Sequence, residues 1–310
     1  MEAENSWKTF SDIGFAKYQT REYKEAIIAC EKSHSLNPDE SYALYLLGCI
    51  YHAKKNYSLS ISYFSKAIAI DKLYDYFFAR GLCKYELEEY EGAIEDLNYA
   101  IILENSFKPN YYWIARCKFE LGNFEDAFWE LNKAFYLNTT CQSLNKWYLK
   151  EDHLFSLRGE IHYELDNYEE AIKDLDKAIE MDSNNDDHFL LRAESKYELN
   201  KIEEALDDIN KGLKINPKNQ YLWNLMAHLN LKKDDDQNAL VNINKAIEID
   251  ADEPWFYETR GICKMNLQKY EDAITDFEKG LAIDSEYKNS INLKEECIKE
   301  IENKKSYKSS

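Results

Sequence analysis

Glycine and proline are scarce in this chain, and their scarcity limits the fold. The 310 residues include nine Gly and four Pro, which is little turn-forming material for a sheet of many short strands. Residues that favour helices, chiefly Glu, Lys, Leu, Ile and Ala, are abundant instead. We therefore expect an all-α protein.

Other absences restrict the setting in which the protein works. No stretch reaches the roughly 18 apolar residues that a helix needs to cross a bilayer, and the beginning MEAENSWKTF lacks a basic region followed by an apolar run. The seven cysteines are dispersed, without a CxxC pair or a Cys/His cluster at metal-ligand spacing. They are typical of reduced core residues. We expect a cytoplasmic protein without a membrane segment, a metal or a cofactor.

The charge is strongly one-sided, with a formal net value of −19. Such acidity opposes binding to nucleic acids, because that affinity comes largely from Lys and Arg that displace counterions from phosphates. It favours a neutral or basic protein partner, although acidic side chains also simply keep a protein in solution.

Catalytic patterns are also missing. The six histidines are dispersed, no Gly-rich phosphate loop is present, and no Ser or Cys lies in a nucleophile motif. We expect no enzymatic activity.

A repeated unit accounts for nearly the whole chain. The segment NYEEAIKDLDKAIEMD at 167–182 returns in varied form along the sequence. Its first small residue recurs at intervals of 34, 33, 34, 44, 34, 34 and 34, at Ala26, Ser60, Ala93, Ala127, Ala171, Ala205, Ala239 and Ala273. A fixed period of this length predicts a solenoid of stacked units.

Each period contains two amphipathic helices, with apolar or small residues three and four positions apart on one face of each. The units begin at about 7, 41, 74, 108, 152, 186, 220 and 254. The organisation that we predict is a lead-in at 1–6, four units at 7–141, an insertion at 142–151, four units at 152–287, and a capping helix with a frayed tail at 288–310. The insertion is expected to form an extended helix or a packed excursion, with an interaction loop as the alternative.

Positions within a unit show the same regularity. Place 8 is always Gly or Ala, which lets the two helices approach closely, and places 20 and 27 are small. Place 17 is aromatic in six units, and Pro38 and Pro217 stand at place 32. These features resemble tetratricopeptide repeats over about residues 7–287. The resemblance implies a right-handed α-solenoid of about eight helix pairs plus a C-terminal capping helix. The seventh unit is the weakest match, with Asp236 at the aromatic place.

Arginine and aspartate occur together in four units. Arg stands at place 7 and Asp sixteen residues later, in the pairs Arg80 and Asp96, Arg158 and Asp174, Arg192 and Asp208, and Arg260 and Asp276. We predict structural ion pairs that join the two helices of a unit.

The candidate partner-binding surface is a stripe at places 5, 9 and 12 of the first helices. In proteins of the family that it resembles, this stripe lines a concave peptide-binding groove. It presents Phe15, Tyr18, Tyr45, Phe78, Leu82, Tyr85, Tyr112, Arg116, Phe119, Glu160, Tyr163, Leu190, Glu194 and Tyr197. The acidic rim at place 13 consists of Glu86, Glu120, Glu164 and Glu198. The competing interpretation is that individual aromatics seal one unit against the next.

The predicted function is a noncatalytic scaffold or adaptor that grips a peptide or helix of a partner protein, with apolar and basic residues in the ligand. Two alternatives are a regulatory or sensory subunit that responds to a peptide or small ligand, and an accessory subunit of an enzyme complex. RNA-reading helical repeats are disfavoured by the charge. Binding of chaperone tails is disfavoured because Lys never stands at place 5 and Asn never at place 9. The oligomeric state and the partner's identity do not follow from the sequence.

Overall fold

The structure is a computed structural model that describes residues 2–137, 149–286 and 288–308. The described residues form α-helices joined by short turns, without a β-strand among them. The predicted all-α repeat fold is therefore confirmed. Within the part of the chain described, no helix is long and apolar enough to span a membrane. The chain divides into two compact units, Met1–Lys150 and Glu151–Ser310.

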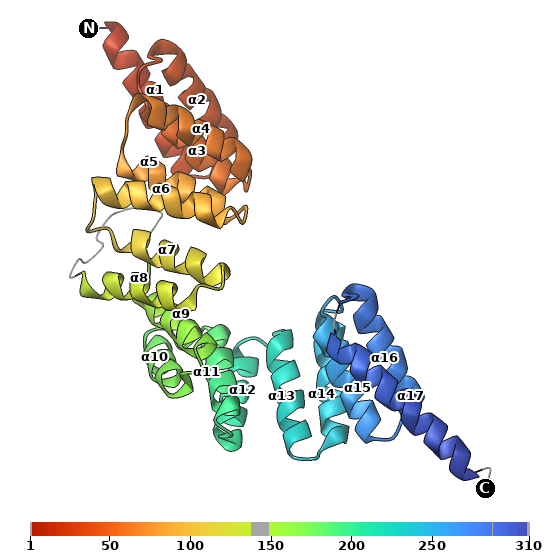
Figure 1. The fold of residues 1–310 in the computed structure, drawn as a ribbon. Coiled ribbons are helices and arrows are strands. Elements are labelled where there is room, and N and C mark those ends of the chain that lie inside the picture. The colour runs from red at the N-terminus through yellow and green to blue at the C-terminus, as the bar shows by residue number, and fades with distance from the viewer. Residues whose placement is uncertain (1, 138–148, 287, 309–310) are drawn as a thin grey trace. The chain divides into compact units, whose positions relative to one another are not determined.

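The first unit consists of four helix pairs (Figure 1). Its helices are α1 (Glu2–Gln19), α2 (Tyr23–Leu36), α3 (Tyr42–Ala53), α4 (Tyr57–Ile70), α5 (Tyr74–Tyr85), α6 (Tyr90–Leu103), α7 (Lys108–Glu120) and α8 (Phe124–Tyr136). Pro109 lies in the first turn of α7, where its missing N–H costs no helical hydrogen bond.

The second unit consists of four helix pairs and a final single helix. Its helices are α9 (Glu151–Glu164), α10 (Tyr168–Met181), α11 (Asp186–Glu198), α12 (Ile202–Ile215), α13 (Gln220–Lys232), α14 (Asp236–Ile249), α15 (Pro254–Asn266), α16 (Tyr270–Ile283) and α17 (Lys288–Lys308). Asn289 Nδ2 and Ser290 Oγ of α17 donate to the carboxylate of Glu258 on α15, at 2.8 and 3.1 Å. The last helix thereby covers the exposed end of the stack.

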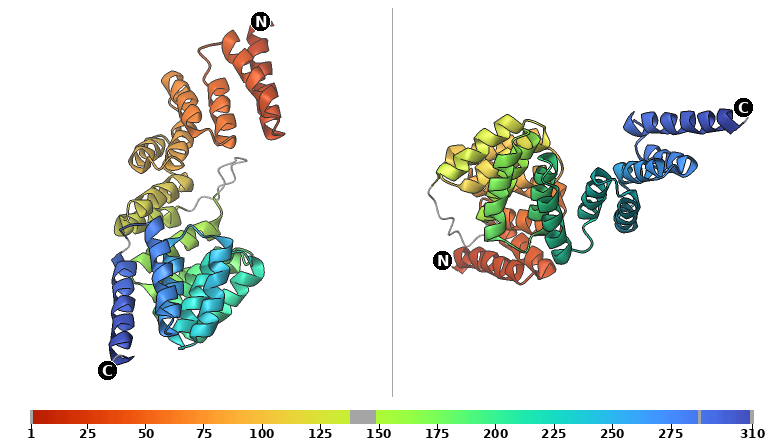
Figure 2. Two further views of the ribbon diagram at one scale, coloured as in Figure 1. Left: turned by 90° about the vertical axis from the view of Figure 1, so that its right-hand side faces the viewer. Right: turned by 90° about the horizontal axis from the view of Figure 1, so that it is seen from below.

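Consecutive helices of each unit pack side by side, as the order of colours in Figure 2 shows. The odd-numbered helices thus form one layer of a unit and the even-numbered helices the other. Each odd-numbered helix contacts the next odd-numbered helix of its unit, for example α3 with α5 and α11 with α13. No such contact joins two even-numbered helices in the described part of the chain. The first helices of the pairs therefore form the tighter, inner layer, and this layer carries the candidate surface.

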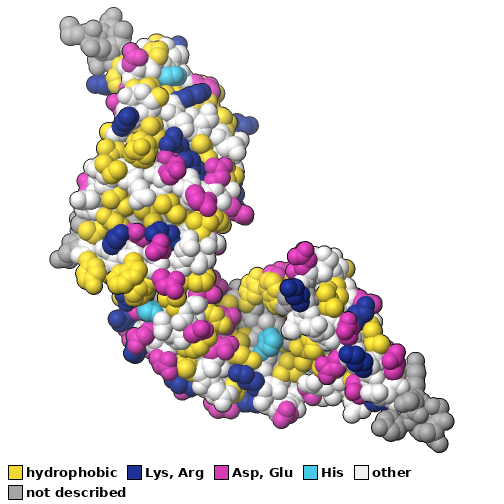
Figure 3. All heavy atoms as spheres, viewed as in Figure 1, with side chains coloured by type: hydrophobic (Ala, Val, Ile, Leu, Met, Phe, Trp, Pro, Cys, Tyr) yellow, Lys and Arg dark blue, Asp and Glu magenta, His cyan; other side chains and the backbone are white. Residues whose placement is uncertain are grey.

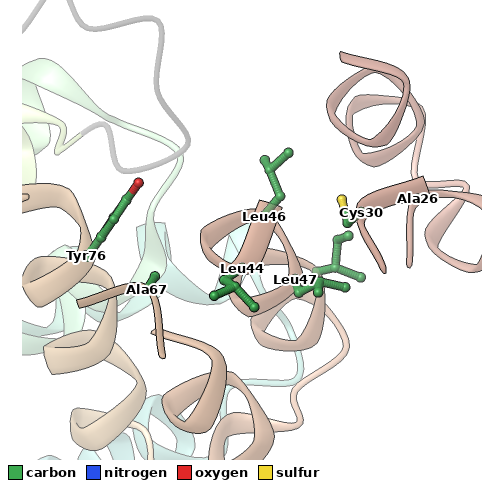
Figure 4. Close-up of a cluster of buried hydrophobic side chains, with 8 residues drawn as sticks. Ala26, Cys30, Leu44, Leu46, Leu47, Ala67 and Tyr76 are labelled. Atoms are coloured by element: carbon green, nitrogen blue, oxygen red, sulfur yellow. The ribbon is translucent and has the colours of Figure 1, made fainter. Parts of the chain in front are cut away.

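The core is shared between neighbouring repeats. One cluster draws side chains from α2, α3, α4 and α5 (Figure 4): Ala26, Cys30, Leu44, Leu46, Leu47, Ile50, Ala67 and Tyr76. The small residues at place 8 make the close helix contacts possible. A Cβ atom added to Gly48 would lie 2.5 Å from the Phe64 ring, and one added to Gly261 would lie 2.4 Å from the Phe277 ring.

The turn inside every pair repeats one backbone conformation. The second residue after each first helix, or the third after α5, has a positive φ between 56° and 73°. These residues are Arg21, Lys55, Glu88, Gly122, Asp166, Asn200, Asp234 and Gln268. Its N–H and the next N–H bond back to the helix, as in Lys55 N to His52 O at 2.8 Å and Asn56 N to Tyr51 O at 2.9 Å. This is the Schellman motif that ends many helices, and its positive-φ residue is usually glycine. In the eight turns described here, that residue is glycine only at Gly122.

Two expectations concern the segments between and after the repeats. Most of the predicted excursion at 142–151, including Trp147 and Tyr148, lies outside the described residues, and α9 begins at Glu151. The tail from Lys304 was expected to fray. In the structure α17 continues to Lys308, and Lys304 Nζ donates to the Gln268 side chain at 3.0 Å; fraying of the tail stays a prediction.

Candidate functional site

The four predicted Arg and Asp pairs are formed in the structure, each between the two helices of one repeat. In every pair Nε and Nη2 of Arg donate to the two carboxylate oxygens, at 2.8 and 2.6 Å in Arg80–Asp96, 2.7 and 2.7 Å in Arg158–Asp174, 2.9 and 2.6 Å in Arg192–Asp208, and 2.9 and 2.7 Å in Arg260–Asp276. Two parallel bonds fix the orientation of both groups.

A second cation reinforces three of these carboxylates. Lys84 Nζ lies 2.9 Å from Asp96, Lys196 Nζ 2.7 Å from Asp208, and Lys264 Nζ 2.6 Å from Asp276. The aspartates are buried, so these contacts brace the two helices of each pair.

Two members of the predicted stripe in the first unit are corrected by the structure. Phe78 and Leu82 of α5 are buried, with 0% and 5% of their surface exposed. The Phe78 ring meets Phe107 edge-on, with 5.1 Å between centroids. Phe107 immediately precedes α7, so the beginning of the next repeat covers place 5 of this one. These two side chains belong to the core and not to a binding surface.

Other stripe residues of the first unit also seal repeats together. The Tyr45 ring lies 4.9 Å from that of Tyr76, and the Tyr85 ring lies 4.9 Å from that of Trp113, each in the following repeat. Arg116 Nε is 3.0 Å from Glu120 Oε1. The remaining stripe residues are exposed or partly buried, namely Phe15, Tyr18, Tyr112 and Phe119.

The second unit contains a cavity of about 460 Å³ on its layer of first helices. Its lining comes from α9, α11, α13 and α15 and consists of Tyr163, Glu194, Tyr197, Glu198, Tyr221, Asn224, Leu225, His228 and Trp255. Volumes of this size hold one or a few side chains of a ligand. Here the structure brings together Tyr163, Glu194 and Tyr197 of the predicted stripe with Glu198 of the predicted rim.

Aromatic and polar contacts fix the walls of this cavity. The rings of Tyr197 and His228 meet edge-on at 6.4 Å, and His228 Nε2 lies 3.2 Å from Thr259 Oγ1. Lys232 Nζ sits 3.4 Å from the centroid of the Tyr197 ring and donates to the Tyr197 carbonyl at 3.0 Å. Burial lowers the pKa of His228, and nearby Lys232 lowers it further, so the imidazole is neutral at pH 7.

The carboxyl group of Glu194 is the electrostatic anomaly of the cavity. Its pKa is raised to about 7, chiefly by burial and also by the negative charges of Glu164, Glu198 and Glu160. No hydrogen bond or ion pair joins Glu194 to another residue in the described ranges. The Oδ1 atom of Asn224 is buried in the same lining and likewise has no hydrogen-bond partner there.

Five lining residues were absent from the predicted surface. Asn224 and His228 stand at places 5 and 9 of the seventh unit, so extending the same stripe by one repeat would have found them. Leu225, Tyr221 and Trp255 occupy places 6 and 2, outside the stripe. Their approach depends on how consecutive repeats stack, which the spacing within a repeat does not reveal. Glu160 and Leu190 do not line the cavity.

The described residues contain no group of three or more His, Cys, Asp or Glu arranged to hold a metal ion. Exposed acidic side chains are spread over both units among hydrophobic ones on the face drawn in Figure 3. The cavity offers aromatic surface and hydrogen-bond acceptors to a ligand.

Comparison of the chain with solved structures supports the fold. A tetratricopeptide repeat protein from Parabacteroides merdae ATCC 43184 has 16% identity and a TM-score of 0.63, over 84% of this chain and 99% of that one. A chain of the APC/C hetero-tetramer Cut9-Hcn1 has 13% identity and a TM-score of 0.67, over 89% of this chain and 52% of that one. The chain thus spans about half of the latter's length. No curated protein sequence matches it.

Family models with the description tetratricopeptide repeat match four segments of the sequence. One model matches residues 154–185, and another matches 41–72, 221–253 and 256–287. The matches lie on helix pairs of both units, including the seventh repeat, whose aromatic place is taken by Asp236. This chain therefore contains tetratricopeptide repeats in both of its units.

Proposed function

We propose that this protein is a noncatalytic scaffold that binds a segment of a partner protein, and that the cavity of its second unit receives part of that segment. The carrying observation is the cavity itself, to which the first helices of four successive repeats contribute. Tyr and Trp side chains provide large contact area at a small cost in conformational entropy. Tyr221 and Trp255 keep 38% of their surface exposed and are free to contact a ligand.

The family supports the general role, because tetratricopeptide repeats generally bind proteins or peptides. The cavity also contains two acceptors without partners among the described residues, Glu194 and Asn224 Oδ1. Unsatisfied buried acceptors cost free energy unless a ligand or water supplies donors. The six cysteines that the structure describes are buried and unbridged, which fits our further proposal that the protein works in the reducing cytoplasm.

The test is affinity capture from the source cells with purified wild-type protein and the double variant Tyr221→Ala/Trp255→Ala. Both side chains are partly exposed, so we expect circular dichroism to show unchanged helicity. A partner retained by the wild type and lost by the double variant supports the proposal. A partner retained equally by both contradicts it.

A second function is favoured by the even-numbered helices of the first unit. Tyr99, Ile102, Trp129 and Tyr136 on α6 and α8 keep 57%, 77%, 67% and 88% of their surface exposed. Such exposed apolar side chains often mark protein contacts, as expected of an accessory subunit that docks through its second helices. The variant Trp129→Ala/Tyr136→Ala distinguishes the two functions in the same affinity capture. Loss of the partner in this variant alone favours docking through the second helices.

A further inference from the structure

The cavity of the second unit lacks a cation. Elsewhere in the chain, buried carboxylates such as Asp208 receive two donors from Arg and a third from Lys. Glu194 receives none from the described residues, although Glu160, Glu164 and Glu198 add further negative charge around it. A carboxyl group in such surroundings is stabilised by a positive group that enters with a ligand.

Aromatic rings give the same cavity a second affinity for cations. Tyr163, Tyr197, Tyr221 and Trp255 line it, and a cation near the face of such a ring is attracted by the ring's negative face. One of these rings already makes such a contact, since Lys232 Nζ lies 3.4 Å from the centre of the Tyr197 ring. No Lys or Arg is among the residues that line the cavity.

The hydrogen-bond acceptors in the cavity also favour a cationic ligand. Glu194 and Asn224 Oδ1 both accept hydrogen bonds, and both lack partners in the part of the chain described. A lysine ammonium has three N–H donors and an arginine guanidinium has five. Either group has enough donors for both acceptors, and its aliphatic stem is able to pack on aromatic rings.

We propose that the cavity receives a lysine or arginine side chain of the partner segment, with Glu194 as its counter-ion and the aromatic rings as its walls. This inference rests on the proposed function and names the chemistry of the ligand at the same site. The partner is a protein segment and not a free polyamine, because the cavity opens onto the layer of first helices, where exposed Tyr221 and Trp255 offer further contact to flanking residues.

The experiment selects binders from a bead-displayed library of random dodecapeptides with three proteins: the wild type, Glu194→Gln and Glu169→Gln. Glu169 is an exposed residue of the second helix α10, so its variant has the same formal net charge as Glu194→Gln and controls for general attraction of basic peptides. We expect Lys or Arg at one peptide position to be enriched about tenfold by the wild type and Glu169→Gln, and not by Glu194→Gln.

Equal enrichment by all three proteins, or selected peptides without enriched Lys or Arg, overturns the inference while peptide binding stands. Selection of no peptide above background by any of the three contradicts the proposed function itself. Spermidine added to a selected peptide provides the last arm. Displacement of the peptide at concentrations comparable to its own assigns the cavity to small polyamines and overturns the choice of a protein segment.

Discussion

At the scale of single residues, buried Asp208 and partly exposed Glu194 of the second unit have opposite electrostatic surroundings. Asp208 is held by Arg192 and Lys196 and is fully enclosed. Glu194 lines a cavity without a counter-ion among the described residues. The first arrangement stabilises the fold, whereas the second reduces stability and leaves a group ready for a ligand.

Glu194→Gln should make the protein more stable at neutral and alkaline pH. The pKa of Glu194 is about 7 in the folded protein, above its ordinary value of 4.5. Its contribution to stability is therefore complete below pH 4.5 and is lost as the pH rises through about 7. Urea unfolding at pH 5 and pH 8 should show an advantage of the variant that grows with pH, up to about 3 kcal/mol. An advantage that does not change with pH contradicts the assignment, and Glu169→Gln is the control.

Asp208→Ala should destabilise the protein much more than Asp176→Ala, although both aspartates contact Arg192. The Asp208 side chain is 0% exposed and that of Asp176 is 49% exposed. Removing the buried carboxylate leaves Arg192 and Lys196 uncompensated, which costs about 3 kcal/mol. Removing the exposed one costs less than about 1 kcal/mol. Similar urea midpoints for the two variants would show that burial does not decide the strength of these pairs.

At the scale of elements, the turn inside each helix pair is the feature that sequence alone hides. Seven of the eight turns place a residue other than glycine at positive φ, where a Cβ atom is disfavoured by about 1 kcal/mol. The stacked helices on both sides hold these residues in place.

Lys55→Gly should therefore stabilise the protein, and Gly122→Ala should destabilise it, each by about 0.5–1 kcal/mol. Lys55 is exposed with φ 58°, and Gly122 has φ 73° with no atom within 4 Å of an added Cβ. Steric contact thus plays no part, and backbone conformation alone determines both signs. Thermal unfolding measures the two changes, and equal signs would contradict the backbone explanation.

The helix pairs, their small contact residues and the Arg and Asp partners were predictable from the sequence because each depends on spacing within one repeat. Gly48 facing Phe64 and Arg80 facing Asp96 are separated by sixteen residues in the same pair. Burial of Phe78 beneath Phe107 and the approach of Trp255 to the Glu194 cavity depend on contact between different repeats. Those contacts are determined by how repeats stack, which a single-repeat pattern does not specify.

At the scale of the whole molecule, stability is a sum of repeat and neighbour contributions, because the contacts between helices link adjacent repeats. The effect of a local change should spread only to its neighbours. Hydrogen exchange of Asp208→Ala should become faster in α11 and α12 and less so in α10 and α13, while α1 to α6 keep their protection. Faster exchange throughout both units would show that the chain unfolds as one body.

The central claim is that the second unit binds a protein segment in its aromatic and acidic cavity. It is tested most directly by replacing Trp255 with the photoreactive residue p-benzoylphenylalanine and irradiating living cells, with the same replacement of Trp129 on α8 for comparison. Our account predicts one cross-linked partner from position 255, absent when Glu194→Gln is combined with it, and none from position 129. A partner cross-linked from position 129 alone, or the same yield from both positions, contradicts it.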